Sequence, residues 1–416
     1  MSDHVLSKST VQGSSILRNG TKFILALQHL IAMFGATVLV PILTGFNPTV
    51  AIFTAGVGTL IFHLCTKGKV PAFLGSSFAF IPVIITVKEI YNGDLAYAQG
   101  GIVIAGLIYC IMAAVIYKVG AEKIRKLLPA QVVGPMIIVI GLNLLPTAVN
   151  MASNNYLLAA ITLGTALFIK FKTDGMLNQL SILIAVLVGY LVSLGLNLVD
   201  TSVIASAPLL SIPPLNFPKF DIGAIAIISP VVLAVFMEHL GDITTNGQVV
   251  GKNFIKDPGL HRTLLGDGLA TLFAGFLGGP ANTTYGENTG VLAITKNYDP
   301  SILRWTAVLA IILSFVGKIG GVLLSIPTAV MGGISVMLFS MIAIIGVQTI
   351  QREKVNFNIK NIIIMGTILT LGLGSEYIGN TIGINIGIRL NESVSISGLS
   401  FAAIVGILLN LILNRE

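Results

Sequence analysis

Four carboxylates occur within apolar stretches of the sequence, at Glu238, Asp242, Asp267 and Glu287. Glu238 and Asp242 are four residues apart, which places their side chains on one face of a helix. An ionisable group in hydrocarbon costs free energy and therefore has a partner, a proton or a function. Burial and a neighbouring carboxylate both favour the neutral carboxyl group. Glu238, Asp242 and Glu287 are therefore candidates for proton exchange near neutral pH.

Two of these carboxylates have structural alternatives. Asp242 at the inner end of a span would also suit a bond to backbone donors. For Asp267, which lies early in its span, a structural role at a helix end is favoured over a functional one.

Two short polar stretches interrupt the apolar runs, at Gly75–Ser77 and Thr283–Thr284. Their small residues suit an extended segment, and a helical run follows each one. Those helices would begin in mid-membrane with unpaired N–H groups, at Phe78 and at Tyr285–Glu287, and with a positive dipole end. Such ends bind carbonyl or anionic oxygens. A kinked helix with close packing at its small residues is the alternative, and the occurrence of a pair favours a binding site.

Other side chains near these stretches have more modest roles. His29 is predicted to orient neighbouring groups, His239 to pack, and Lys318 to reach the outer surface with its ammonium group. The aromatic rings of Phe78 and Tyr285 would flank a planar ligand. A heterocycle with alternating carbonyl and N–H groups fits this inventory, and so does an anion.

The elements that carry these residues are those of an all-α polytopic membrane protein. Of 416 residues, 54% are hydrophobic and 10% charged, and the mean hydropathy is +0.92. A span needs about 20 apolar residues. The sequence predicts fourteen spans, at 23–45, 49–65, 70–88, 97–117, 130–149, 156–171, 177–198, 222–241, 264–279, 281–295, 303–325, 328–350, 359–375 and 396–413. The first is expected to be retained rather than cleaved as a signal peptide.

The basic residues support this topology. With a cytoplasmic N-terminus, all of the 24 Lys and Arg except Lys88, Lys219, Lys318 and Arg389 fall on the inside, as the positive-inside rule requires. Without a crossing at 281–295, five of them would move outside. The polar stretch therefore crosses, which is tolerated only where it is buried in protein or lines a cavity.

The net charge of +7 is explained by these cytoplasmic loops, and no nucleic-acid partner is implied. Cys65 and Cys110 are expected to be small buried hydrophobes without a disulfide or a metal. No metal-binding or nucleophile motif indicates an enzyme, and no cofactor is expected.

A weak internal repeat joins the two halves. Gln28-His29-Leu30 matches Glu238-His239-Leu240, and Ser76-Ser77-Phe78 after a Pro-Ala pair matches Thr283-Thr284-Tyr285 after another. Seven spans separate the copies, so the halves run in opposite directions. Inverted repeats with broken helices are typical of secondary transporters, with the site near the midplane.

Several motifs resemble the nucleobase–ascorbate transporter family, also called nucleobase:cation symporter-2, and within it the bacterial uracil permeases. They are Gln28-His29 through Met33-Phe34-Gly35-Ala36, Gly75 through Phe80, Asp257 through Arg262, Asn282 through Gly290, and Thr295-Lys296. The resemblance covers nearly the whole chain.

The resemblance implies fourteen segments in two inverted repeats of seven, with spans 3 and 10 broken into a short extended stretch and a half-helix. After an N-terminal cytoplasmic segment (1–22), a core domain would comprise 23–128 and 222–327, and a gate domain 129–221 and 328–416. It also implies a homodimer and symport of uracil with protons, driven by the proton gradient.

Site residues follow from the resemblance at matching positions. Glu238 and Glu287 would hydrogen-bond the base. Phe78, Tyr285 and Gly286 would supply backbone amides or ring contacts, and Ala36 would line the pocket. Proton coupling is assigned to Glu287, Glu238 and Asp242, and pocket or supporting positions to His29, Gln28, Asn288, Phe339 and Ser77.

Two positions depart from the family pattern. The best-known uracil permeases have His at the position of Asp242 and Tyr at that of Phe339, and Asp242 resembles purine-transporting members. Those members usually have Gln at the position of Glu287, so Glu287 favours uracil, with xanthine as the alternative. An anion carrier of the same fold is disfavoured because facing glutamates repel anions. The expected setting is a bacterial plasma membrane, with a multi-pass chain and both termini cytoplasmic.

Overall fold

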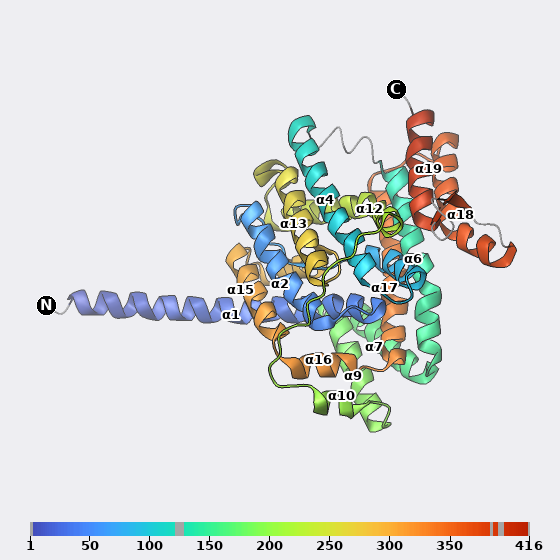
Figure 1. The fold of residues 1–416 in the computed structure, drawn as a ribbon. Coiled ribbons are helices and arrows are strands. Elements are labelled where there is room, and N and C mark those ends of the chain that lie inside the picture. Colours follow the sequence, from blue (N-terminus) through green and yellow to red (C-terminus); the bar gives the residue numbers. More distant parts are fainter. Residues whose placement is uncertain (1–2, 121–128, 383–385, 390–394, 415–416) are drawn as a thin grey trace.

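The computed structural model describes residues 3–120, 129–382, 386–389 and 395–414, although side chains at 3–19, 376–377, 379–382, 389 and 395–397 are not described. The first helix, α1 (Asp3–Thr44), begins well before the predicted first span, and its N-terminal part extends away from the other helices (Figure 1). Its apolar part is Gly20–Thr44.

Within the described residues, six helical stretches are long and apolar enough to cross a membrane. They are Gly20–Thr44, α2 (Pro48–Cys65), α4 (Ala96–Val119), α6 (Ala130–Ser153), α11 with α12 (Ile222–Ile228 and Val231–Val250), and α17 (Thr328–Arg352). Other helices account for most of the remaining predicted spans: α7 (Tyr156–Lys172), α9 (Ser181–Gly195), α13 (Leu260–Leu277), α15 (Pro300–Ser314), α16 (Gly317–Leu324), α18 (Ile359–Ile382) and α19 (Gly398–Leu413). The molecule is a multi-pass membrane protein, and the count of fourteen spans and the inverted repeat stay predictions.

The two predicted breaks are present and lie side by side. Strand β1 (Leu74–Ser76) pairs antiparallel with β2 (Asn282–Thr284), with Gly75 opposite Thr283. A 3₁₀ turn, η1 (Phe78–Phe80), and α3 (Ile81–Ile90) follow β1, and α14 (Gly286–Thr295) follows β2. All six strand residues are buried. Because buried backbone groups need partners in a membrane, each strand supplies what the other lacks.

The helices pack in two groups. In one, α13 lies against α2 and α4, and α15 lies against α1 and α2; in the other, α17 lies against α6 and α7, and α18 against α6 and α19 (Figure 1). Glycines permit the closest crossings. A Cβ on Gly106 of α4 would lie 2.5 Å from the Leu272 nitrogen, and one on Gly141 of α6 would lie 2.5 Å from the Ala343 nitrogen. Small residues are the usual means of close helix contact in membranes.

Three residues outside the breaks differ in detail from expectation. Lys318 Nζ donates to the carbonyls of Ile204 (2.8 Å) and Ala205 (3.0 Å), so its ammonium group caps α10 (Thr201–Ser206). Cys65 and Cys110 are free thiols, and both are half-buried rather than fully buried.

Candidate functional site

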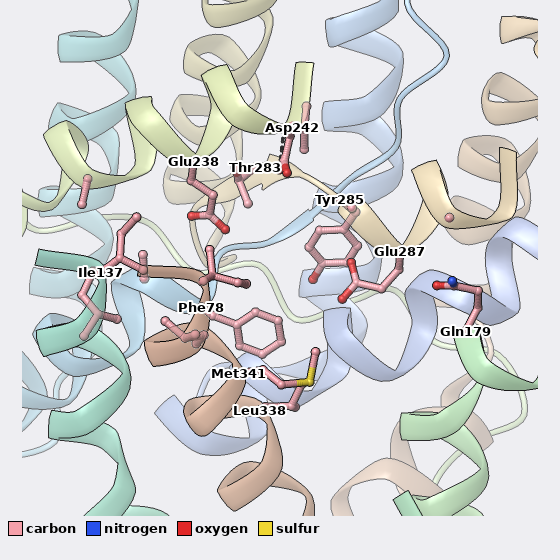
Figure 2. A pocket seen from close by; sticks show the side chains of 18 of the residues that line it. Phe78, Ile137, Gln179, Glu238, Asp242, Thr283, Tyr285, Glu287, Leu338 and Met341 are labelled. Atoms are coloured by element: carbon pink, nitrogen blue, oxygen red, sulfur yellow. Dashed lines mark hydrogen bonds between the residues drawn. The ribbon is translucent and has the colours of Figure 1, made fainter. Parts of the chain in front are cut away.

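A cavity of about 320 Å³ lies between the two helix groups, within the size range of small-molecule sites. Figure 2 shows its lining. Helix α12, the breaks and the helix starts that follow them contribute Phe78, Ala79, Ala234, Glu238, Asp242, Thr283, Thr284, Tyr285, Gly286, Glu287 and Gly290. Helices α6, α7 and α17, with α8 after α7, contribute Ile137, Ile140, Lys170, Gln179, Leu338, Met341, Ile342 and Ile345.

Helix α12 presents two carboxylates to the cavity. Glu238 and Asp242 lie one turn apart and both line it, as their spacing predicted. The Thr284 hydroxyl donates to Asp242 Oδ2 at 3.3 Å. This bond links α12 to β2, and its donor is a side chain, whereas the alternative considered from the sequence was a backbone donor.

Helix α14 presents the third carboxylate. Glu287 is in its first turn, and Tyr285 precedes the helix in extended conformation (φ −104°, ψ 120°). The amides of Gly286 and Glu287 have no helical acceptor because of their position. Figure 2 shows the carboxylates of Glu238 and Glu287 turned from opposite sides toward the space beside Phe78. The site can therefore offer acceptors, donors and an aromatic face to one planar ligand.

Tyr285 differs from the sequence prediction. Its backbone N–H donates to the Phe73 carbonyl (3.0 Å), so the amide is not free for a ligand. Its hydroxyl donates to the Ser76 carbonyl at 2.9 Å. A Cβ on Gly75 would lie 2.3 Å from Tyr285 Cζ, so the ring occupies the space that a side chain at position 75 would need. Tyr285 thus fixes the two strands together as well as lining the cavity.

The supporting positions lie behind the cavity. Asn288 Nδ2 is 3.1 Å from His29 Nδ1 and donates to the His29 carbonyl at 3.1 Å, which ties α14 to α1. Ser77 is buried, and its N–H donates to the Ala281 carbonyl (2.8 Å). Gln28 does not line the cavity.

Two residues expected at the pocket are elsewhere. Ala36, predicted to line it, is buried in α1 within the apolar cluster that includes Met33 and Tyr285. Phe339 is fully buried in α17, and its neighbour Leu338 faces the cavity.

The fourth carboxylate has a partner of its own. Asp267 Oδ2 lies 2.8 Å from His239 Nδ1, and His239 Nε2 lies 3.0 Å from Thr263 Oγ1. The His239 ring and the Asp267 carboxylate are both buried away from the cavity. Asp267 lies within α13 rather than at a helix end, so its predicted location was wrong, and the contacts are those of a structural pair.

Sequence reasoning missed Lys170 and Gln179. The charge pattern assigned Lys170 to the cytoplasmic end of its span, and nothing in the sequence distinguishes it from Lys172. Gln179 ends the five-residue helix α8 (Gly175–Gln179). The packing of α8 against α14 brings Gln179 to the cavity, and Lys170 reaches it from the end of α7.

Comparison with known proteins decides the family. A family model described as "Permease family" matches residues 20–380. The chain is 43% identical over 405 residues to the uracil permease of Bacillus caldolyticus, with 94% of this chain and 91% of that one covered. It is 38% identical over 401 residues to the uracil permease of Escherichia coli K12, with 93% and 90% covered. The chain belongs to the nucleobase:cation symporter-2 family.

A solved structure shares the fold of this family member. The transmembrane domain of the cyanobacterial bicarbonate transporter BicA matches with a TM-score of 0.62 at 15% identity, covering 96% of this chain and 98% of that one. At that identity the likeness concerns the fold alone. Membership of a permease family makes the protein a transporter.

Proposed function

We propose that this protein imports uracil together with protons across a bacterial plasma membrane. The observation that carries the proposal is the facing pair Glu238 and Glu287, beside Phe78 in one cavity (Figure 2). Support also comes from relatives that are uracil permeases.

The chemistry of uracil suits these groups. Uracil is a planar ring with two N–H donors and two carbonyl acceptors. Glu238 and Glu287 accept from the ring N–H groups, and the amides of Gly286 and Glu287 donate to a ring oxygen. The ring packs against Phe78. A site that pairs each polar group of its ligand discriminates strongly against molecules that leave one unpaired.

Protons enter the mechanism because three carboxylates share the cavity. Their mutual repulsion in a low-dielectric space is relieved when one binds a proton. Outside, proton and base binding reinforce each other; inside, the lower proton activity releases both. Transport requires the two helix groups to move relative to each other, so that the cavity opens to one side at a time.

Two competing functions make different predictions. An anion carrier is disfavoured because Glu238, Asp242 and Glu287 would repel its substrate. Xanthine is the closer competitor, because Asp242 lines the cavity at a position where purine-transporting members carry Asp.

The test is uptake of radiolabelled uracil into proteoliposomes under an imposed pH gradient, inside alkaline. We expect saturable accumulation that collapses when the gradient is removed. Glu287→Gln should reduce proton-driven accumulation by about 100-fold, since a buried charge-assisted hydrogen bond contributes about 3 kcal/mol. Glu89→Gln, at an exposed residue of α3 outside the cavity, is the matched control and should transport normally.

Two results would contradict the proposal. Unchanged proton-driven accumulation by Glu287→Gln would remove the assigned role of this carboxylate. Competition by xanthine but not by uracil would change the substrate.

A further inference from the structure

The charges lining the cavity are unevenly distributed. The three carboxylates Glu238, Asp242 and Glu287 all come from α12 and α14. Among the described lining residues one cation faces them, Lys170, and it comes from α7 in the other helix group. The parts of α6 and α17 that complete this wall are apolar. Lys172 and Asp174, which follow Lys170, are exposed and outside the lining.

The turn after Lys170 holds it in this position. Asn178 Nδ2 donates to the carbonyl of Lys170 (2.6 Å) and to that of Thr173 (3.0 Å), which fixes the connection from α7 into α8. At the end of α8, Gln179 packs on Gly290 of α14 so closely that a Cβ there would lie 2.6 Å from the Gln179 amide atoms. Helix α8 therefore docks on α14, the helix that carries Glu287, and Lys170 stands at the junction.

The side chain of Lys170 is suited to a variable partner. It is half-buried, and it lines the same cavity as Glu287. Among the described residues the two groups form no direct ion pair, and the cavity that both line lies between their helices. A long flexible stem lets an ammonium group adjust its position while its methylenes stay against apolar surface.

We infer that Lys170 is the counter-charge of the empty site. It favours the anionic form of Glu287 once substrate and proton have left. When Glu287 binds a proton again with the next substrate, the electrostatic attraction between the two groups is lost. This inference rests on the proposed function and deepens it. Lys170 is a positioning residue for the charge on Glu287 rather than a ligand of the base.

The sign of its effect follows directly. A cation near a carboxylate favours the charged form, so that its removal lets Glu287 keep a proton to higher pH. In Lys170→Gln, the pH profile of uracil uptake should move toward alkaline values by about one unit, the scale of a single nearby charge. Release of the proton inside should slow, so net uptake should fall about tenfold while uracil–uracil exchange across the membrane stays near the original rate.

Three variants separate this role from a structural one. Lys170→Arg keeps the positive charge and should restore both the profile and net uptake. Lys172→Gln removes an exposed charge two residues away and should change neither. Equal shifts in Lys170→Gln and Lys172→Gln, or no shift in Lys170→Gln while the unaltered protein transports uracil, would overturn the inference and leave the proposed function intact.

A second measurement needs no substrate. Thermal unfolding of the substrate-free protein at pH 8 should be compared for Lys170→Gln, Glu287→Gln and the double variant. Coupled sites give non-additive changes, so the effect of Lys170→Gln should depend on whether Glu287 is present. Additive changes would overturn the inference. Absence of uracil transport by the unaltered protein would instead count against the proposed function, and this cycle would still decide the role of Lys170.

Discussion

The two breaks use the same backbone arrangement for different chemistry. In both, a three-residue buried strand leads into a helix start, and the two strands form one ladder. The break in the first half presents Phe78 to the cavity and carries no charge. The break in the second half presents Glu287 and the first-turn amides of α14, which have no helical acceptor. The strand that leads into a helix start is thus present in both breaks, while the carboxylates that line the cavity come from the second break and α12 only.

The same asymmetry appears one helix away. Glu238 of α12 lines the cavity, whereas Gln28, its counterpart in the sequence match, does not. His29 bonds Asn288, while His239 contacts Asp267 and Thr263. Internal similarity therefore identifies where a site lies, but the residue types decide which half carries the charge and which supplies apolar wall and support.

The largest expected effect comes from exchanging the charged member of this pair. Glu238→Gln should lower uracil uptake by about 100-fold, because a buried carboxylate that accepts a ring N–H is replaced by a neutral amide. Gln28→Leu should change uptake by no more than about twofold. Initial uptake rates and uracil binding by calorimetry give both values. Similar losses in the two variants would remove the asymmetry.

A smaller effect tests how the breaks hold each other. Gly75→Ala should force the Tyr285 ring away and destabilise the protein by about 1–3 kcal/mol, the usual cost of overpacking. Uptake should fall with it, because Tyr285 lines the cavity. Gly164→Ala, at an exposed position of α7 with open space, is the control. Thermal unfolding in detergent measures the difference, and equal melting temperatures would contradict a tight contact at Gly75.

The smallest effect concerns a carboxylate of the second half outside the cavity. Asp299 pairs with Lys22 (2.7 Å) and accepts from the Ser301 N–H (2.9 Å) at the start of α15. Partial burial opposes its ionisation, but the hydrogen bonds from Lys22 and Ser301 prevail and lower the pKa of Asp299 to about 2. Its stabilising effect is complete above the unfolded pKa near 4 and is lost as pH falls through about 2.

Asp299→Ala should therefore cost about 1 kcal/mol, as for a lost helix cap. The cost should be constant between pH 5 and 8, and the pH profile of uptake should not move. Thermal unfolding at several pH values checks the first point, and proteoliposome uptake the second. A shifted uptake profile would mean that proton coupling is not confined to the cavity.

Much of this site was predictable because it depends on local rules. Small polar residues predicted extended stretches at Gly75–Ser77 and Thr283–Thr284, close to the observed strands at 74–76 and 282–284. Helical spacing predicted that Glu238 and Asp242 share a face. The sequence did not indicate which side of each helix faces the cavity or how separate helices pack on one another. Leu338 rather than Phe339 faces the cavity because adjacent residues on a helix point about 100° apart.

Lys170 and Gln179 illustrate the second limit. Their approach to Glu287 depends on how a five-residue helix docks on a glycine in a distant segment, which no local pattern records. The amide of Tyr285 was predicted to be free because helix starts usually leave donors unpaired. It is bonded to Phe73 because β1 lies alongside, a partner that is remote in the sequence.

The β1–β2 ladder also has a consequence for biogenesis. Leu74 N–H donates to Thr59 Oγ1 on α2, but the strand partner of β1 is β2, which is made only after most of the chain has left the ribosome. Until then this buried strand has polar backbone groups without their final partners, a costly condition in hydrocarbon. The strand β1 therefore cannot reach its final form during synthesis of the first half alone. A chain truncated before residue 282 would lack the binding site and also the partner strand of β1.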